Sequence, residues 1–176
     1  MSTYLVTGAA GFIGSALVRL LASGGAARVV SVDALTYAAD LERLRPAGGG
    51  TGHRFVQLDV NDQAAMLELL REEQPAAVIH LAAETHVDRS IDGPRQFVQA
   101  NTVGTFNLLE AVRHYWWDLP AAARQAFRMV NVSTDEVYGA LGPTGMFDEN
   151  SRYDPRSPYS ASKAGADHFA AAYFHT

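Results

Sequence analysis

Short apolar runs rich in β-forming residues alternate along this chain with longer stretches that carry apolar residues at helical spacing. We expect strands over residues 4–7, 28–33, 54–59, 77–81 and 127–133. The spacing predicts helices over residues 12–23 and 62–73, over about 93–117, and over about 158–173. Such alternation is typical of successive βαβ units. Because runs such as Val29-Val30-Ser31-Val32 are apolar on both faces, the sequence predicts an α/β fold of Rossmann type, a doubly wound parallel sheet.

Local signals mark some helix ends and loops. Asn61 or Asp62 is expected to cap the second helix, and Pro75 to close it. The run Gly48–Gly52 predicts a flexible surface loop, and residues 139–157, rich in Gly, Pro and Asp, predict a longer one. No internal repeat or linker divides the chain, so we expect a single domain.

Composition excludes several classes of function. With 176 residues, 48% of them hydrophobic, the chain can bury a core and is typical of a soluble globular protein. A net charge of -5 without a basic run argues against nucleic acid as a partner. The absence of cysteine removes disulfides and thiolate metal sites, so no metal is expected and a reducing cytoplasm fits. No apolar run approaches the ~20 residues that span a bilayer, and no signal-peptide pattern is seen, so neither a membrane nor secretion is expected.

A glycine-rich turn follows the first expected strand and opens the first helix. Its glycines, Gly8, Gly11 and Gly14, have the spacing G-x-x-G-x-x-G, one residue longer than the common G-x-G-x-x-G fingerprint. Small residues at such a turn let backbone N–H groups and the helix N-terminus approach a pyrophosphate. The alternative is a turn that only packs a helix on a strand. The order of strand, turn and helix favours a dinucleotide site.

Two aspartates end the next two strands. Asp33 lies about 20 residues beyond the turn, where a carboxylate accepts hydrogen bonds from the adenosine ribose and repels a 2′-phosphate. This position favours NAD over NADP, although an Asp at a strand end also serves as a turn former. Asp59 could bond the adenine amino group. Its alternative is a place beside the helix cap at Asn61 or Asp62.

Tyr159 and Lys163 stand four residues apart on the last helix and therefore share one face. The ammonium can lower the pKa of the phenol, which makes the tyrosine a usable base for a substrate hydroxyl. A Y-x-x-x-K pattern also arises by chance on an amphipathic helix. The glycine-rich turn favours the catalytic interpretation.

Thr134, Asp135 and Glu136 follow the fifth expected strand, at the carboxyl edge where open α/β sheets bind ligands. Thr134 could hydrogen-bond the same substrate hydroxyl as Tyr159. Adjacent carboxylates repel, which tends to raise one pKa and lets a neutral acid and an ionised base coexist. A capped turn with both acids solvated is the alternative.

With these residues assembled, the chain resembles the extended short-chain dehydrogenase/reductases, and among them the dTDP-glucose 4,6-dehydratase family, from Tyr4 to its end. Beyond the general motifs, the resemblance is carried by residues 32–38, 80–90 and 133–139. Related epimerases and decarboxylases generally lack the Asp135-Glu136 pair. The resemblance implies oxidation at carbon 4 by Tyr159 with Lys163, Thr134 and NAD. Water is then eliminated by Glu136 at carbon 5 and Asp135 at the 6-hydroxyl, and hydride returns to carbon 6.

The resemblance also implies which residues line the sites. Those at the cofactor are Gly8, Gly11, Phe12, Ile13, Gly14, Asp33, Ala34, Leu35, Thr36, Asp59, Val60, Leu81, Ala82, Ala83, Thr85, Tyr159 and Lys163. Those at the sugar are Thr85, Thr134, Asp135 and Glu136. His86, Asp88 and Arg89 could either anchor a loop or touch substrate. Ala100 stands where the family commonly has a threonine, which puts in doubt a hydroxyl contact to the cofactor at that position.

Further expectations concern assembly and length. The helix of about residues 93–117 corresponds to family helices that pair across a homodimer interface; its aromatics Tyr115, Trp116 and Trp117 could instead pack in the core. Family members are about twice as long as this chain. Residues 1–176 are therefore expected to be a fragment that forms most of the NAD-binding Rossmann domain. The last strands of the sheet and the C-terminal substrate domain, which selects the nucleotide, would be absent, and we expect little turnover from this stretch alone.

Alternatives remain open in two classes. Among enzymes, the chain could belong to a dehydratase acting on a UDP-, CDP- or GDP-hexose, or to an NAD-dependent 4-epimerase. From a different class, it could be an NAD-binding module without turnover.

Overall fold

The computed structural model describes residues 1–25, 27–47 and 52–176, and the chain divides into two compact units. The first unit comprises residues 1–82 and 107–132, and the second comprises residues 83–106 and 133–176. Most of the expected loop at Gly48–Gly52 falls outside the described residues.

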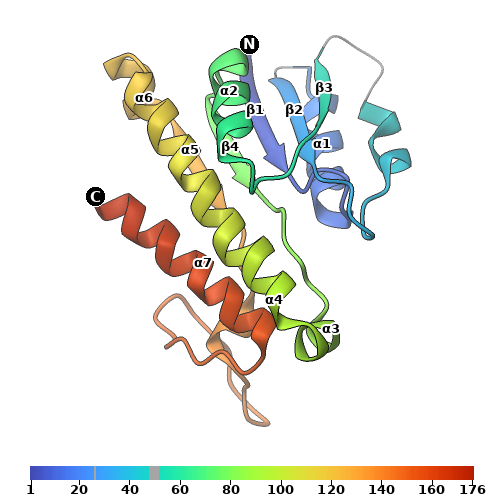
Figure 1. Cartoon of the computed structure of the whole chain (residues 1–176), viewed down its shortest axis with the longest axis vertical. Coiled ribbons are helices and arrows are strands. Elements are labelled where there is room, and N and C mark those ends of the chain that lie inside the picture. Colours follow the sequence, from blue (N-terminus) through green and yellow to red (C-terminus); the bar gives the residue numbers. More distant parts are fainter. Residues whose placement is uncertain (26, 48–51) are drawn as a thin grey trace. The chain divides into compact units, whose positions relative to one another are not determined.

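The first unit is built on a five-stranded parallel sheet with the order β3-β2-β1-β4-β5 (Figure 1). Its strands are β1 (Ser2–Thr7), β2 (Ala27–Asp33), β3 (His53–Gln57), β4 (Ala77–His80) and β5 (Arg128–Asn131). The order reverses at β1, which pairs with β2 on one side and β4 on the other. That reversal is the switch point of a Rossmann-type sheet, beside which such folds bind ligands. The predicted fold class is confirmed, with strand ends shifted by one or two residues.

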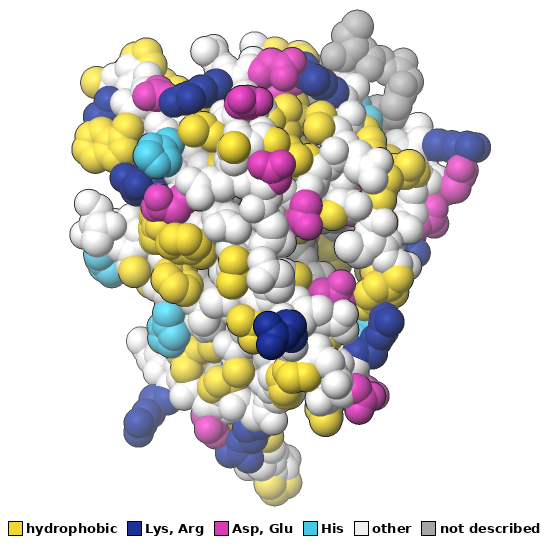
Figure 2. Space-filling view, in the orientation of Figure 1, with side chains coloured by type: hydrophobic (Ala, Val, Ile, Leu, Met, Phe, Trp, Pro, Cys, Tyr) yellow, Lys and Arg dark blue, Asp and Glu magenta, His cyan; other side chains and the backbone are white. Residues whose placement is uncertain are grey.

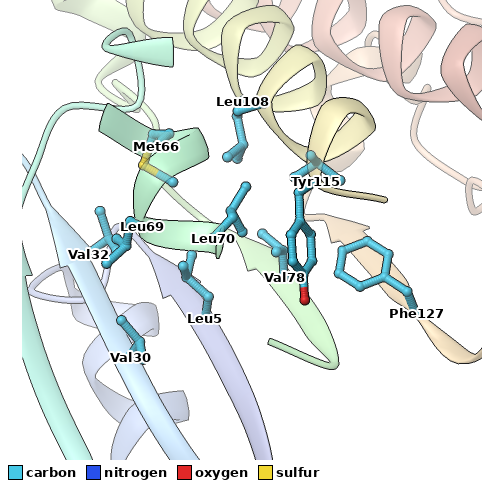
Figure 3. Packing of buried hydrophobic residues seen from close by; sticks show 12 residues of the cluster. Leu5, Val30, Val32, Met66, Leu69, Leu70, Val78, Leu108, Tyr115 and Phe127 are labelled. Atoms are coloured by element: carbon cyan, nitrogen blue, oxygen red, sulfur yellow. The ribbon is translucent and has the colours of Figure 1, made fainter. Parts of the chain in front are cut away.

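Residues on neighbouring positions of the strands face opposite layers. Leu5, Val30 and Val78 belong to a core with residues of α2 (Gln63–Glu73) and α5 (Gly104–Asp118), as Figure 3 shows. Val6 and Val29 belong to a second core, which contains residues of α1 (Phe12–Ser23) and of the 3₁₀ helix Leu41–Ala47. Both faces are therefore covered, which is why these strands are apolar almost throughout.

The helix boundaries follow the signals in the sequence closely. α1 has the predicted ends, and Asp62 is the residue that caps α2, since its Oδ1 accepts a hydrogen bond of 3.0 Å from the N–H of Ala65. α2 ends at Glu73; its C-cap, Gln74, has a left-handed φ of 45° and directly precedes Pro75. A short helix that the sequence did not predict, α6 (Ala121–Ala126), precedes β5.

The aromatic end of α5 divides between core and surface. Tyr115 is buried, packs edge-to-face on Phe127 with ring centroids 5.7 Å apart, and donates its hydroxyl to the carbonyl of Pro75 (Figure 3). Trp116 is partly buried against the same core, whereas Trp117 is 55% exposed. The core interpretation therefore accounts for Tyr115, and the expected homodimer stays a prediction.

The second unit is mostly helical. It contains α3 (Val87–Asp92), α4 (Pro94–Phe97), the π-helical segment Val98–Val103, the first residues of α5, the 3₁₀ helix Asp135–Tyr138 and α7 (Pro158–His175). The helix expected over about residues 93–117 is thus a composite of α4, the π segment and α5. Apolar spacing predicts a helix here but does not reveal which backbone hydrogen-bond register it adopts, and π segments are too rare to expect without a specific signal.

Side chains of both charges are interspersed on the face drawn in Figure 2, where the described basic residues do not gather over any single element. Among the helices of the described ranges, none is long and apolar enough to cross a membrane.

A buried carboxylate joins the two strands at one edge of the sheet. The side chain of Glu73, at the end of α2, is 3% exposed and forms ion pairs with Arg28 of β2 and Arg54 of β3. The hydrogen bond from Arg28 is the main reason why the pKa of Glu73 lies below its usual value. Because the folded-state pKa is lowered, this stabilisation is present above the unfolded pKa of about 4.3 and is lost as pH falls through the folded pKa.

We expect Glu73→Gln to lower the free energy of unfolding by about 1–3 kcal/mol at neutral pH, since two arginines lose a buried charged partner. Urea unfolding at pH 7 measures the loss, and the difference between variant and wild type should shrink below about pH 4. Glu68→Gln, an exposed carboxylate of the same helix, should change stability by less than about 0.5 kcal/mol. A loss that persists unchanged in acid would contradict this role.

Candidate active site

The glycine-rich turn of the first unit brings backbone against backbone. Gly8 has a left-handed φ of +66°, and a Cβ added there would lie 2.6 Å from the backbone nitrogen of Ala82, just past β4. A Cβ on Gly14 would lie 2.1 Å from the carbonyl oxygen of Gly8. Both distances are too short for any side chain, so these glycines set how closely α1 and the segment after β4 approach the turn.

The N-terminus of α1 lacks a side-chain cap. Gly11 occupies the N-cap position in extended conformation and provides no side-chain cap for the first N–H groups. The next two side chains, Phe12 and Ile13, are 82% and 64% exposed. Uncapped N–H groups and the positive end of the helix dipole suit an anionic group. This end of α1 therefore fits a pyrophosphate.

Asp33 holds the turn from the end of β2. One carboxylate oxygen accepts the N–H of Ala10 at 2.9 Å, and the other accepts the N–H of Leu35 at 2.8 Å. Leu35 has a left-handed φ of 58°. Asp33 thus acts as a turn former, the alternative that the sequence left open. A carboxylate oxygen accepts more than one hydrogen bond, so a ribose contact stays a prediction that is compatible with this arrangement.

The loop after Asp33 lines a solvent-open pocket, whose walls are Leu35, Thr36, Ala39, Asp40, Leu41 and Glu42. Two of the predicted cofactor residues, Leu35 and Thr36, therefore lie at a pocket next to the turn. Asp59 accepts hydrogen bonds of 2.9 Å from the N–H and the side-chain amide of Asn61 and does not cap α2. Val60 is buried.

A polar contact that the sequence did not reveal joins the carboxyl ends of β1 and β4. The buried hydroxyl of Thr7 lies 2.7 Å from Nδ1 of His80, which is also buried, and accepts the N–H of Ala82 at 3.3 Å. Leu81 donates its N–H to the carbonyl of Thr7 at 3.2 Å. These bonds fix Leu81 and Ala82 at the switch point, while the predicted cofactor residues Ala83 and Thr85 belong to the second unit.

The second unit brings the predicted chemical residues together. Tyr159 and Lys163, on α7, are 7% and 4% exposed. Thr134 caps the 3₁₀ helix that carries Asp135 and Glu136, accepting the N–H of Glu136 at 3.3 Å, and it hydrogen-bonds Tyr159. Both acids are exposed. Phenol, hydroxyl and carboxylates therefore share one site within this unit.

Burial dominates the proton affinities at this site. It raises the pKa of Tyr159 above the usual value, as do the charges of Glu136 and Asp135, whereas the hydrogen bond with Thr134 lowers it. The expectation that this pKa is lowered is wrong for the chain alone. Burial also lowers the pKa of Lys163, and the charge of Asp167 opposes that effect.

Asn101, in the π segment, supports α7 through hydrogen bonds that no pattern in the sequence indicated. Its amide accepts the N–H of Glu84 at 2.8 Å and donates to the carbonyl of Glu84 at 2.9 Å and to Oγ of Ser162 at 2.8 Å. Nearby, a Cβ on Gly165 would lie 3.3 Å from the side chain of Thr102, so α7 packs tightly on the π segment. Only the polarity of a residue inside an apolar helix could have drawn attention to Asn101, which is 1% exposed.

Four residues near α3 that were named from the sequence, Thr85, His86, Asp88 and Arg89, are exposed. Thr85 precedes α3, and His86, Asp88 and Arg89 lie at or within that helix. Their alternatives, loop anchoring and substrate contact, stay open. No group of three or more His, Asp or Glu side chains that could hold a metal ion occurs within the described ranges.

Comparison with protein families assigns the chain. The family model described as GDP-mannose 4,6 dehydratase matches residues 5–176. The chain belongs to this family. Among curated members, the dTDP-glucose 4,6-dehydratase of Xanthomonas campestris pv. campestris is 56% identical over 176 residues, which make up 100% of this chain and 50% of that protein. The first dTDP-glucose 4,6-dehydratase of Escherichia coli K12 is 46% identical over 98% of this chain and 50% of its own length.

Solved structures agree with this family assignment. The dTDP-glucose 4,6-dehydratase DesIV of Streptomyces venezuelae, crystallised with NAD, matches with a TM-score of 0.87 and 42% identity over 99% of this chain and 52% of its own. The UDP-glucose 4-epimerase of Thermus thermophilus, also with NAD, matches with a TM-score of 0.83 and 32% identity over 98% and 51%. The chain spans about half the length of the curated relatives that it matches. The resemblance inferred from the motifs is confirmed.

The close packing at Gly8 makes a specific prediction for this dehydratase-family chain. We expect Gly8→Ala to lower the free energy of unfolding by roughly 3 kcal/mol or more, because a left-handed alanine and a backbone clash add. Gly25→Ala is the matched control, since Gly25 has a φ of +63° but nothing within 4 Å of an added Cβ. It should cost only about 1–2 kcal/mol. Urea unfolding of both variants measures the difference, and equal losses would contradict the role of the close approach.

Proposed function

We propose that the chain carries the cofactor-binding and catalytic residues of a dTDP-glucose 4,6-dehydratase, which converts dTDP-glucose to dTDP-4-keto-6-deoxyglucose. The observation that carries the proposal is the hydrogen bond between Tyr159 and Thr134, with the charges of Asp135 and Glu136 acting on the same phenol. A dehydrogenase or an epimerase also needs Tyr159 and Thr134, because both enzymes oxidise a substrate hydroxyl. The two adjacent acids supply what the loss of water additionally requires.

Residues 1–176 would form most of the NAD-binding Rossmann domain of this enzyme, with its substrate domain elsewhere. NAD fits the first unit because α1 begins without a side-chain cap, at a turn whose glycines let backbone pack directly on backbone. Asp33 favours NAD over NADP, since a carboxylate repels a 2′-phosphate. The other residues proposed to line it are Gly11, Phe12, Ile13, Ala34, Leu35, Thr36, Asp59, Val60, Leu81, Ala82, Ala83, Thr85, Tyr159 and Lys163.

The reaction would begin at the sugar's 4-hydroxyl. Tyr159 takes the hydroxyl proton, with Thr134 holding the same oxygen and Lys163 supplying positive charge close by. When bound, NAD would supply the acceptor for the hydride of carbon 4 and the source of the hydride that returns to carbon 6. The product of this step is a 4-keto sugar, in which the carbonyl acidifies the C–H bond at carbon 5.

Elimination would then fall to the two acids. Glu136 removes the proton at carbon 5, and Asp135 protonates the departing 6-hydroxyl, so that one water leaves and a carbon–carbon double bond forms between carbons 5 and 6. Reduction at carbon 6 with protonation at carbon 5 completes the 4-keto-6-deoxy sugar. Thr85 would join Thr134 and the two acids at the sugar.

Two enzyme alternatives and one non-enzyme alternative compete with this proposal. The UDP-glucose 4-epimerase of Thermus thermophilus shares the fold and 32% of the residues, but epimerisation needs no acid–base pair at carbons 5 and 6. A dehydratase acting on a UDP-, CDP- or GDP-hexose would use the same residues on another nucleotide. An NAD-binding module would bind the cofactor without turnover.

We also propose a homodimer through the helices of residues 93–117, which would place Trp117 near a partner.

The decisive experiment incubates the full-length protein with NAD and dTDP-glucose in D₂O. We expect the sugar to lose one water, to gain solvent deuterium at carbon 5 and to leave no net NADH. Glu136→Gln should slow the loss of water by about 10²–10⁴-fold, while Glu149→Gln, an exposed carboxylate of the following loop, should not. Mass spectrometry of the nucleotide sugar measures both.

Each alternative has its own outcome in this experiment. An unchanged mass with inversion at carbon 4 would indicate an epimerase. Loss of water only from another nucleotide sugar would reassign the substrate. Binding of NAD without reaction of any sugar, and without any effect of Tyr159→Phe, would indicate a binding module.

The raised pKa of Tyr159 predicts a second measurable property. Without NAD, the phenol should ionise above its ordinary value of about 10, as measured by the tyrosinate absorbance of the protein minus that of Tyr159→Phe. Saturating NAD should move this ionisation to lower pH, because the nicotinamide ring carries a positive charge. Ionisation at or below pH 10 before NAD is added would contradict the dominant effect of burial.

A further inference from the structure

Asp167 lies on α7 one helical turn beyond Lys163 and accepts two hydrogen bonds at the same oxygen. Oδ2 accepts the hydroxyl of Ser133, and it accepts the hydroxyl of Tyr153 at 3.2 Å. All of these residues belong to the second unit. A single carboxylate thus ties the catalytic helix to two separate segments of the chain.

Both donors flank the segment that carries the acids. Ser133 directly precedes Thr134, Asp135 and Glu136. Tyr153 directly precedes Asp154, whose N–H donates to the carbonyl of Val137 at 3.0 Å. The carboxylate is therefore connected to the 3₁₀ helix Asp135–Tyr138 from its N-terminal side and along its length.

Aromatic contacts hold Tyr153, the second donor to Asp167, against the 3₁₀ helix and α7. The ring of Tyr153 lies 5.4 Å from that of Tyr138, at the end of the 3₁₀ helix, and 4.8 Å from that of His168 on α7. Its pKa is raised to about 12, by burial first and then by the charge and hydrogen bond of Asp167. Tyr153 therefore keeps its proton, and remains a donor to Asp167, throughout the neutral pH range.

We propose that Asp167 is a positioning residue that holds Asp135 and Glu136 in register with Tyr159 and Lys163. The inference rests on the proposed function, because it assigns Asp167 to the alignment of the oxidation and elimination groups. Asp167 has no part of its own in the proton and hydride transfers proposed above. Since Thr134 bonds Tyr159 and follows Ser133, a shift of this segment moves the hydroxyl and both acids away from the phenol together.

The same carboxylate also faces the buried ammonium. The charge of Asp167 raises the pKa of Lys163, against the opposing effect of burial. A role through charge alone and a role through hydrogen-bond geometry therefore have to be separated by experiment. Asparagine in place of Asp167 removes the charge and keeps an acceptor oxygen, whereas alanine removes both.

The first test measures kcat and KM for the loss of water in the full-length protein with NAD. We expect Asp167→Ala to lower kcat by about 10- to 100-fold, because small displacements of catalytic groups cost this much, with KM within about 3-fold of wild type. Asp167→Asn should recover most of kcat. Asp148→Ala is the matched control, since Asp148 accepts similar bonds from Ser151 and Asn150 in the neighbouring loop, and it should leave kcat unchanged.

The second test measures hydrogen exchange in the protein without cofactor. Asp167→Ala should speed exchange at the amides of Val137, Gly139 and Asp154, which bond to carbonyls of the acid segment or its loop, and leave the amides of β1 unchanged. Ser133→Ala removes one donor from an exposed position. It should reproduce both effects in weaker form, and it decides the question if Asp167→Ala does not fold.

The outcomes separate this inference from the proposed function. A kcat within 2-fold of wild type, a change confined to KM, or unchanged exchange in the acid segment would overturn the positioning role. Equal loss in Asp167→Asn and Asp167→Ala would overturn it in favour of charge alone. If the wild-type protein removes no water from any nucleotide sugar, the proposed function fails, and faster exchange in Asp167→Ala would still show that Asp167 holds the segment.

Discussion

Backbone packs directly on backbone where the β1–α1 turn passes the segment after β4, and no side chain can be added there. Gly8 approaches Ala82 and Gly14 approaches Gly8 at distances that exclude a Cβ. The start of α1 is thereby fixed at the switch point of the sheet, where its N–H groups have no side-chain cap. The other predicted cofactor residues of this unit lie at the ends of the strands beside the turn, so their positions depend on that packing.

Polar groups around the turn hold the backbone of the proposed cofactor site in place. Asp33 bonds the backbone of Ala10 and of Leu35, so the carboxylate suited to a ribose also holds the turn in place. Thr7 and His80 pair in the core between β1 and β4, where an unpaired polar group would cost about 1–3 kcal/mol. Orientation of these groups before a ligand arrives reduces the ordering that binding requires.

The sequence predicted the parallel sheet, the residues at its carboxyl edge and the main helices, because these depend on periodicity and on local caps. The limits of α1 and the cap at Asp62 are examples. It did not predict the π segment, the bonds of Asn101 or the pairing of Thr7 with His80. The spacing of apolar residues does not reveal the hydrogen-bond register of a helix, and the other contacts join residues far apart in the chain. The expected lowering of the pKa of Tyr159 failed for a related reason. Spacing on a helix gives the position of Lys163 relative to Tyr159 but not how deeply both are buried.

The two units position their functional groups through different kinds of contact. In the sheet-bearing unit, apolar cores on both faces support backbone groups. In the helical unit, α7 buries Ser160, Ser162 and Lys163. The position of α7 therefore depends on hydrogen bonds, which are directional, as well as on packing. Directional contacts fix the rotation of α7 about its own axis more sharply than apolar packing does. This suits the role that we propose for Tyr159 and Lys163, in which both present one face of the helix to a substrate. It also accounts for polar residues at positions that a purely structural helix would fill with leucine.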